Sequence, residues 1–142
     1  MIQTLAGVDN TAAALSAEQT RLDVISENIA NANTTHGADG KPYQRQVVVF
    51  ESALQQAMSS DGSVQMPAIQ VARIETDNSP PIKVYDPGNP DADAQGMIST
   101  PNININEEMA DMISASRTFE ANLAVVKNAH TMAMETLAIG KH

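Results

Sequence analysis

The sequence predicts an α+β protein in which long N- and C-terminal helices form a coiled-coil-like stalk with a small β module between them. Apolar residues recur with helical spacing near both ends of the chain, and β-branched residues cluster between these segments. The chain of 142 residues has two Phe, two Tyr and no Trp, so it has few large side chains for an independent globular core. We therefore predict a discontinuous helical domain over residues 1–36 and 101–142, and a β-rich outer module with loops over residues 37–100.

The first predicted helix spans residues 4–32. Its apolar seam repeats every seven residues and has further apolar residues beside it: Val8, Leu15, Leu22 and Ile29, with Leu5, Ala12 and Ile25. Asn, Thr, Gly and Pro are dense over residues 31–42 and end the helix there. Asparagine tolerates left-handed geometry and bonds to nearby backbone. We therefore expect four residues to form the helix exit: Asn28, Asn31, Asn33 and Gly37.

Four segments of the central region have strand character. Residues 47–50 are Val-Val-Val-Phe and predict a buried strand. Residues 64–74 alternate with period two, and Pro67 marks an edge or a break. Residues 82–85 and 97–99 predict two further short strands, separated by a rigid, acidic loop over residues 86–96.

The second predicted helix spans residues 107–139. Asn106 suits the N-cap, and Glu107 and Glu108 put negative charge at the positive end of the helix dipole. Gly140 fits the position after the last turn. The seam alternates in steps of three and four for about four heptads: Met109, Met112, Ser116, Phe119, Leu123, Val126, His130, Ala133 and Leu137.

The two seams leave their partners open. They fit intermolecular packing in a tubular polymer, and they fit equally an antiparallel hairpin within one chain, because the spacing of a seam does not identify the helix that packs against it. Isolated helices are marginal in water, so we expect the lone chain to be partly disordered at both ends and to order on assembly. His130 in the seam is either a pH switch or metal ligand, or a polar interruption that sets the helix register, and the last interpretation is favoured.

Composition narrows the function classes. A net charge of −9 argues against a nucleic-acid partner, and no apolar run approaches the roughly 18 residues of a membrane span. The start of the chain lacks the basic flank and apolar region of a cleaved secretory signal. The sequence has no cysteine, nucleophile elbow, phosphate loop or zinc-protease motif. We expect no enzymatic activity, no cofactor and no metal site.

One alternative is a soluble calcium-binding module on a helical hairpin. Asp91, Asp93 and Gln95, followed by Gly96, match the first part of a calcium loop. The twelfth position is Asn102 instead of the usual Glu, so a proline-stiffened turn with side-chain to backbone hydrogen bonds is the favoured interpretation. A secreted helical-hairpin effector or adhesin is a second alternative.

Nearly the whole chain resembles the flagellar proximal-rod proteins of the FlgC type. Four blocks carry the resemblance: LDVISENIANANT at 22–34, DGKPY at 39–43, VYDPGNPDAD at 84–93, and 101–122, which begins PNIN and ends MISASRTFEAN. The first block is shared by rod and hook proteins generally, whereas the third points to the FlgC type. The chain departs from the family at Phe119, where the family usually has Tyr.

The resemblance implies a structural, non-enzymatic subunit of the periplasmic basal-body rod, exported unfolded by the flagellar type III apparatus without a cleaved signal. It implies a homo-oligomer in a helical rod, contacts with rod proteins of the FlgB, FlgF and FlgG types and with the FliE-type adaptor, and no nucleic acid or membrane insertion. Such a rod transmits torque as a drive shaft and encloses the export channel. Phe50 and Leu54 match the Phe-x-x-x-hydrophobic pattern proposed for export-gate recognition, although a core position is the favoured interpretation of Phe50. The expected assembly residues are Leu5, Val8, Leu15, Leu22, Ile25, Ile29, Met109, Met112, Phe119, Leu123, Val126 and Leu137.

Overall fold

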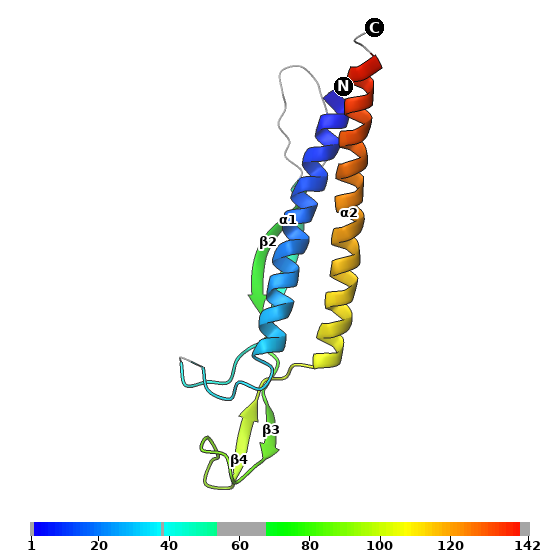
Figure 1. Cartoon of the computed structure of the whole chain (residues 1–142). Helices are drawn as coiled ribbons and strands as arrows, with labels where there is room; N and C mark the ends of the chain where they lie inside the picture. Colours follow the sequence, from blue (N-terminus) through cyan, green and yellow to red (C-terminus); the bar gives the residue numbers. More distant parts are fainter. Residues whose placement is uncertain (1, 38, 54–67, 140–142) are drawn as a thin grey trace.

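The computed structural model describes residues 2–37, 39–53 and 68–139, and it has the predicted α+β architecture (Figure 1). Two small antiparallel sheets lie between two long helices in the sequence. The elements are α1 (Ile2–Ala30), β1 (Gln46–Ala53), β2 (Ala68–Thr76), β3 (Ile82–Tyr85), β4 (Met97–Thr100) and α2 (Ile105–Ile139). Neither helix, within the described residues, has an apolar stretch long enough to cross a membrane.

The helices α1 and α2 lie side by side and antiparallel, with both chain termini at the same end of the molecule (Figure 1). Ala17, Val24 and Ile25 of α1 and Ala115 of α2 are buried. Fully burying an apolar side chain such as Val24 or Ile25 stabilises a fold by about 1.5–3 kcal/mol. The structure therefore contains the hairpin within one chain, which is one of the two packing arrangements that the seams allow.

The stripe of α2 that faces α1 has heptad spacing. Its buried and half-buried members are Glu108, Met112, Ala115, Phe119, Asn122, Val126 and Ala129. Both helices are formed from Ile2 and as far as Ile139, so the structure does not show the partial disorder that we expected of a lone chain. The physical reason is that each helix supplies the packing partner that a single helix lacks.

The strands β1 and β2 form a two-stranded antiparallel ribbon that contacts α1. The register pairs Gln46 with Thr76, and a bulge interrupts it between Val49 and Phe50. The prediction of a buried strand here is wrong, because Val47 and Phe50 are each 37 % exposed. A two-stranded ribbon packed on one helix covers only part of its surface. Pro67 and the other residues of 64–67 lie outside the described part of the chain.

The strands β3 and β4 form a separate hairpin at the end of the molecule opposite the termini (Figure 1). Every residue of β3 is exposed, whereas Ile98 of β4 is buried. Gly96 precedes β4 with a φ of +74°, a conformation that glycine adopts without steric cost. The two strands that we predicted here are confirmed.

The start of α2 differs from the prediction. The helix begins at Ile105, and the Oδ1 atom of Asn104 accepts the backbone N–H of Asn106 at 3.1 Å. Asn104 is therefore the N-cap, and the assignment of Asn106 to that role is wrong. Of the two glutamates in the first turn, Glu107 is exposed and Glu108 is buried.

Candidate assembly site

Asn28, in the last turn of α1, is the centre of a buried hydrogen-bond network between the helices and the ribbon. Its Nδ2 atom donates to the carbonyl of Gln46 at 2.8 Å and to Oε2 of Glu108 at 3.1 Å. Its Oδ1 atom accepts the backbone N–H of Gln46 at 2.9 Å and the hydroxyl of Tyr43 at 3.1 Å. All four hydrogen-bonding positions of the amide are therefore used, and the side chain pairs with the Gln46 backbone as a neighbouring strand would.

Glu108 is the charged member of this network and is only 1 % exposed. Its Oε1 atom accepts a hydrogen bond from Nε of Arg45 at 2.7 Å and forms an ion pair with Nη2 of the same residue, also at 2.7 Å. Arg45 directly precedes β1, so the ion pair links the base of the ribbon to the first turn of α2. A buried carboxylate requires such compensation, because removing an unpaired charge from water is costly.

Tyr43 closes the network on its more exposed side. Burial raises the pKa of its phenol, and the nearby carboxylates of Glu27 and Glu108 raise it further. Each of these causes disfavours the phenolate. Tyr43 therefore stays a hydrogen-bond donor to Asn28 well into the alkaline range.

The helix exit uses the predicted residues in different ways. Asn31 donates from Nδ2 to the carbonyl of Glu27 at 2.9 Å, and the N–H of Gly37 donates to the carbonyl of Lys41 at 2.8 Å. Asn33 is exposed. Among the described residues no side-chain-bearing residue has a positive φ, so the exit does not use the left-handed geometry that asparagine tolerates.

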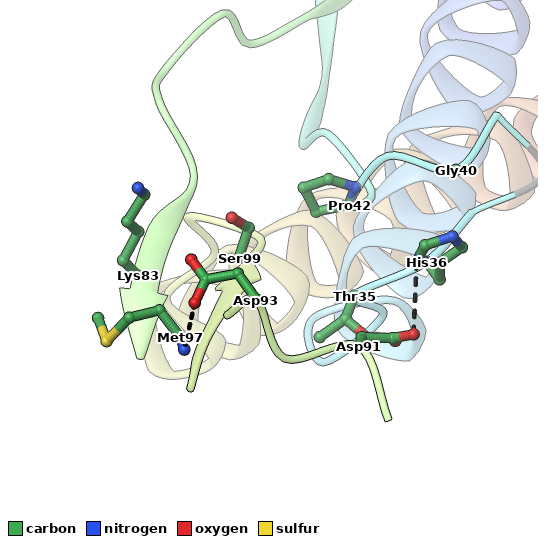
Figure 2. Close-up of a pocket in the computed structure, with 9 residues that line it drawn as sticks. All are labelled: Thr35, His36, Gly40, Pro42, Lys83, Asp91, Asp93, Met97 and Ser99. Carbon is green, nitrogen blue, oxygen red and sulfur yellow. Dashed lines mark hydrogen bonds and ion pairs between the residues drawn. The ribbon is translucent and has the colours of Figure 1, made fainter. Parts of the chain in front are cut away.

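The exit loop and the β3–β4 hairpin enclose a shallow hollow (Figure 2). The hydroxyl of Thr35 donates to Oδ2 of Asp91 at 2.6 Å, and Nδ1 of His36 lies 3.5 Å from Oδ1 of the same carboxylate. Asp91 therefore ties the hairpin to the segment that leaves α1. The lining residues are Thr35, His36, Gly40, Pro42, Lys83, Asp91, Asp93, Met97 and Ser99.

The acidic loop forms the predicted turn with side-chain to backbone hydrogen bonds. Oδ1 of Asp93 accepts the backbone N–H groups of Gln95 and Met97, at 2.8 and 2.9 Å. These N–H groups hold the pKa of Asp93 below its usual value, that of Met97 most strongly. Asp91 and Asp93 engage different partners (Figure 2), and the described residues contain no cluster of three or more acidic or histidine side chains suited to a metal ion. The calcium-binding alternative has no support in this arrangement.

The predicted assembly residues fall into two groups. Those on α1 with described side chains are buried or half-buried, and so are three on α2: Val8, Leu15, Leu22, Ile25, Ile29, Met112, Phe119 and Val126. The helix α1 contacts both α2 and the β1–β2 ribbon. Met109, Leu123 and Leu137 are exposed, as is His130. The side chain of Leu5 lies outside the described residues.

The exposed members belong to a larger apolar surface on α2, which we call the outer apolar face. Its side chains are between 39 % and 77 % exposed. They lie on both flanks of the stripe that faces α1, over residues 105–113 and 123–139: Ile105, Met109, Ile113, Leu123, Val125, Met132, Met134, Leu137 and Ile139.

The Phe50 and Leu54 pattern stays a prediction. Phe50 lies on the ribbon and is partly exposed, which does not fit the core position that we favoured for it. Leu54 lies outside the described residues. The structure therefore does not test the proposed export-gate motif.

Sequence reasoning missed the roles of Arg45, Gln46 and Glu108, and it assigned Glu108 to the helix dipole. A signal was present, because Glu108 shares the heptad line of Ala115, Asn122 and Ala129. A carboxylate on a helix stripe that faces a partner indicates a buried ion pair, although the spacing alone does not identify Arg45 as its partner.

Comparison with known proteins agrees with the resemblance of the sequence. A family described as flagella basal body rod protein matches residues 9–38, and one described as flagellar basal body rod FlgEFG protein C-terminal matches residues 94–139. The chain is 39 % identical to the flagellar basal-body rod protein FlgC of Yersinia enterocolitica, over 94 % of this chain and 95 % of that protein. It is 40 % identical to FlgC of Borreliella burgdorferi, over 88 % of this chain and 90 % of the relative. It is 37 % identical to FlgC of Bacillus subtilis, over 92 % of this chain and 94 % of that protein. The chain therefore belongs to the FlgC family of flagellar basal-body rod proteins.

Proposed function

We propose that this chain, a structural subunit of the flagellar basal-body rod, polymerises helically by burying the outer apolar face of α2 against neighbouring subunits. The observation that carries the proposal is the exposure of large apolar side chains of α2 over residues 105–113 and 123–139. Exposed apolar patches on soluble proteins mark interaction sites. These side chains are exposed to water in the single chain, and contact with a second subunit buries them.

The chemistry of the face suits a rod with several kinds of neighbour. Met109, Met132 and Met134 are flexible and polarisable, so they adapt to contacts that differ from one neighbour to the next. In the proposed rod this face meets a different surface of the next subunit, which is a head-to-tail contact. A head-to-tail contact that does not close into a ring generates a helical filament.

The remaining features of the proposal follow from a tubular assembly. As a member of the rod family, the chain associates with other rod proteins in the basal body. We propose further copies of the chain, proteins of the FlgB, FlgF and FlgG types and the FliE-type adaptor as its neighbours. We also propose that the chain is exported by the type III apparatus without a cleaved signal, lies in the periplasm and has a non-enzymatic role. In the rod, residues 1–36 and 101–142 form the wall around the export channel, and residues 37–100 face outward.

A charge placed on the outer apolar face tests the proposal. Leu123→Asp is expected to abolish swimming and to leave basal bodies without an extended rod, because assembly would bury the new carboxylate. Its side chain is about half exposed in the lone chain, so the helical circular dichroism of the purified variant should be retained.

The matched control is Asn128→Asp, which adds the same charge at an exposed polar position of α2. It should leave swimming close to the parent strain. Normal rods built from Leu123→Asp subunits would show that this face is not an assembly surface.

A further inference from the structure

We propose that Arg45 is a positioning residue, whose ion pair with Glu108 fixes the angle at which the β1–β2 ribbon lies against the helix pair. The inference concerns the geometry of the single chain, so it stands or falls separately from the proposed mode of polymerisation. It also gives the buried carboxylate of Glu108 a role that helix capping does not explain.

Arg45 connects both strands of the ribbon to α2. Its guanidinium donates from Nε to Oε1 of Glu108 and forms an ion pair with the same oxygen through Nη2, and its carbonyl accepts the N–H of Asp77 at 2.7 Å. Arg45 directly precedes β1, and Asp77 directly follows β2. One residue therefore gathers the open end of the ribbon and attaches it to the first turn of α2.

The ribbon has no other direct connection to α2 among the described residues. Both of its strands contact α1, and no strand of the ribbon contacts α2. Contact with a single helix, even with the Asn28–Gln46 hydrogen bonds, leaves a two-stranded ribbon more rotational freedom than attachment to two helices. The second attachment, through Arg45, removes this freedom.

The ion pair between Arg45 and Glu108 is better suited to fixing the position of the ribbon than to stabilising the fold. Glu108 is 1 % exposed and Arg45 is 30 % exposed, so forming the pair removes a carboxylate from water. The cost of that desolvation commonly cancels the attraction within a buried pair, and apolar residues of similar size often stabilise as well. A charge-assisted pair nevertheless has directional bonds, whereas an apolar contact permits sliding. Apolar residues in place of Arg45 and Glu108 would therefore not fix the angle between the ribbon and the helices.

The experiment measures the ribbon angle and the stability separately. The chain has no cysteine, so pairs of introduced cysteines carry spin labels at unique positions. Glu51→Cys with Ser114→Cys reports the distance from the ribbon to α2, and Ser26→Cys with Ser114→Cys reports the distance between the two helices. All three positions are exposed. The test variant is Arg45→Met with Glu108→Gln, which removes both charges and keeps an acceptor for Asn28.

The expected result is a single narrow distance peak for both label pairs in the parent chain. In the test variant the ribbon pair should lose its narrow peak while the helix pair keeps it, with the thermal midpoint unchanged or raised. A control that removes the exposed Arg73 and Glu75 pair of the ribbon, Arg73→Met with Glu75→Gln, should keep both peaks.

A narrow ribbon peak in the test variant would overturn the proposal, and so would broadening of the same size in the control. If the helix pair also broadens, the hairpin is no longer intact in that variant. Arg45→Lys, which keeps a positive charge beside Glu108 but not the planar guanidinium, then replaces it, with the same expected loss of the ribbon peak and the same overturning result.

Discussion

The Nδ2 atom of Asn28 donates a hydrogen bond to Oε2 of Glu108 at 3.1 Å, joining two buried side chains that lie 80 residues apart in the sequence. This bond connects the end of α1 to the start of α2 at the level where the ribbon begins. The same amide pairs with both backbone groups of Gln46. The helix hairpin and the ribbon therefore share one polar joint, and its chemistry makes specific predictions.

Asn28→Asp should destabilise the chain by about 3 kcal/mol, although the side chain keeps its shape. The substitution removes both donors and brings a second carboxylate beside Glu108 and the Gln46 carbonyl, and buried polar groups without partners are costly. Urea unfolding followed by circular dichroism measures the loss. Asn33→Asp adds the same charge at an exposed position and should change stability by less than about 0.5 kcal/mol. Equal effects of the two variants would contradict the described joint.

Tyr43 should ionise at a higher pH in the folded chain than in the unfolded chain. Tyr43 and Tyr85 are the two tyrosines, so in a Tyr85→Phe variant the tyrosinate absorbance reports Tyr43 alone. Its midpoint should lie above 10.0, because burial and the carboxylates of Glu27 and Glu108 raise its pKa. The same variant in denaturant should titrate near 10.

The raised pKa of Tyr43 has a consequence for stability with a definite sign. The folded chain holds the phenol proton more tightly, so this contribution is complete below pH about 10 and is lost as the pH rises through the folded value. Tyr43→Phe should flatten this alkaline decline of the unfolding free energy. A steeper decline in Tyr43→Phe would contradict the assignment.

Gly96→Ala should loosen the β3–β4 hairpin without unfolding the helices. Gly96 has a φ of +74°, and an added Cβ would lie 3.0 Å from Cε2 of Tyr85 and 3.1 Å from Cβ of Pro87. Left-handed geometry alone costs a side-chain-bearing residue about 1–2 kcal/mol. Amide exchange measured by NMR should accelerate at Asp86, whose N–H donates to the Gly96 carbonyl. Gly88→Ala, which meets its nearest neighbour at 3.6 Å, should leave that exchange rate unchanged.

Asn104→Ala should cost about 1 kcal/mol, the usual value for loss of an N-cap side chain. Asn106→Ala should cost much less, because Asn106 contributes its backbone N–H to the cap, which alanine retains. Thermal unfolding of the two variants compares two asparagines that are two residues apart. A larger loss of stability in Asn106→Ala than in Asn104→Ala would show that Asn106 is the N-cap.

The sequence predicted the helices and the β3–β4 hairpin because their determinants are local. Helical spacing and short runs of β-branched residues do not depend on distant parts of the chain. The phase of the second seam was only half correct. Met112, Phe119 and Val126 face α1 as predicted, but the other half of the stripe contains Glu108, Ala115 and Asn122 in place of Met109, Ser116 and Leu123. Small residues allow the close approach of α1, which leaves the large side chains for the outer apolar face.

The polar joint was not predictable in the same way. Asn28 and Glu108 were each noticed for local reasons, as a helix-exit residue and as a charge near the helix start. Their contact with each other and with Arg45 depends on how three distant segments meet. The exposure of Val47 and Phe50 was missed for a related reason, because a run of valines does not reveal how many layers cover the strand.

The burial of the outer apolar face on assembly is the central claim, and cysteine labelling tests it most directly. A cysteine introduced at Leu123 is the only one in the chain, and in the purified monomer it should react readily with a maleimide reagent. In isolated basal bodies it should be protected, whereas a cysteine at Ala94, exposed in the β3–β4 loop, should still react. Equal reactivity at position 123 in the monomer and in the assembled rod would contradict the claim.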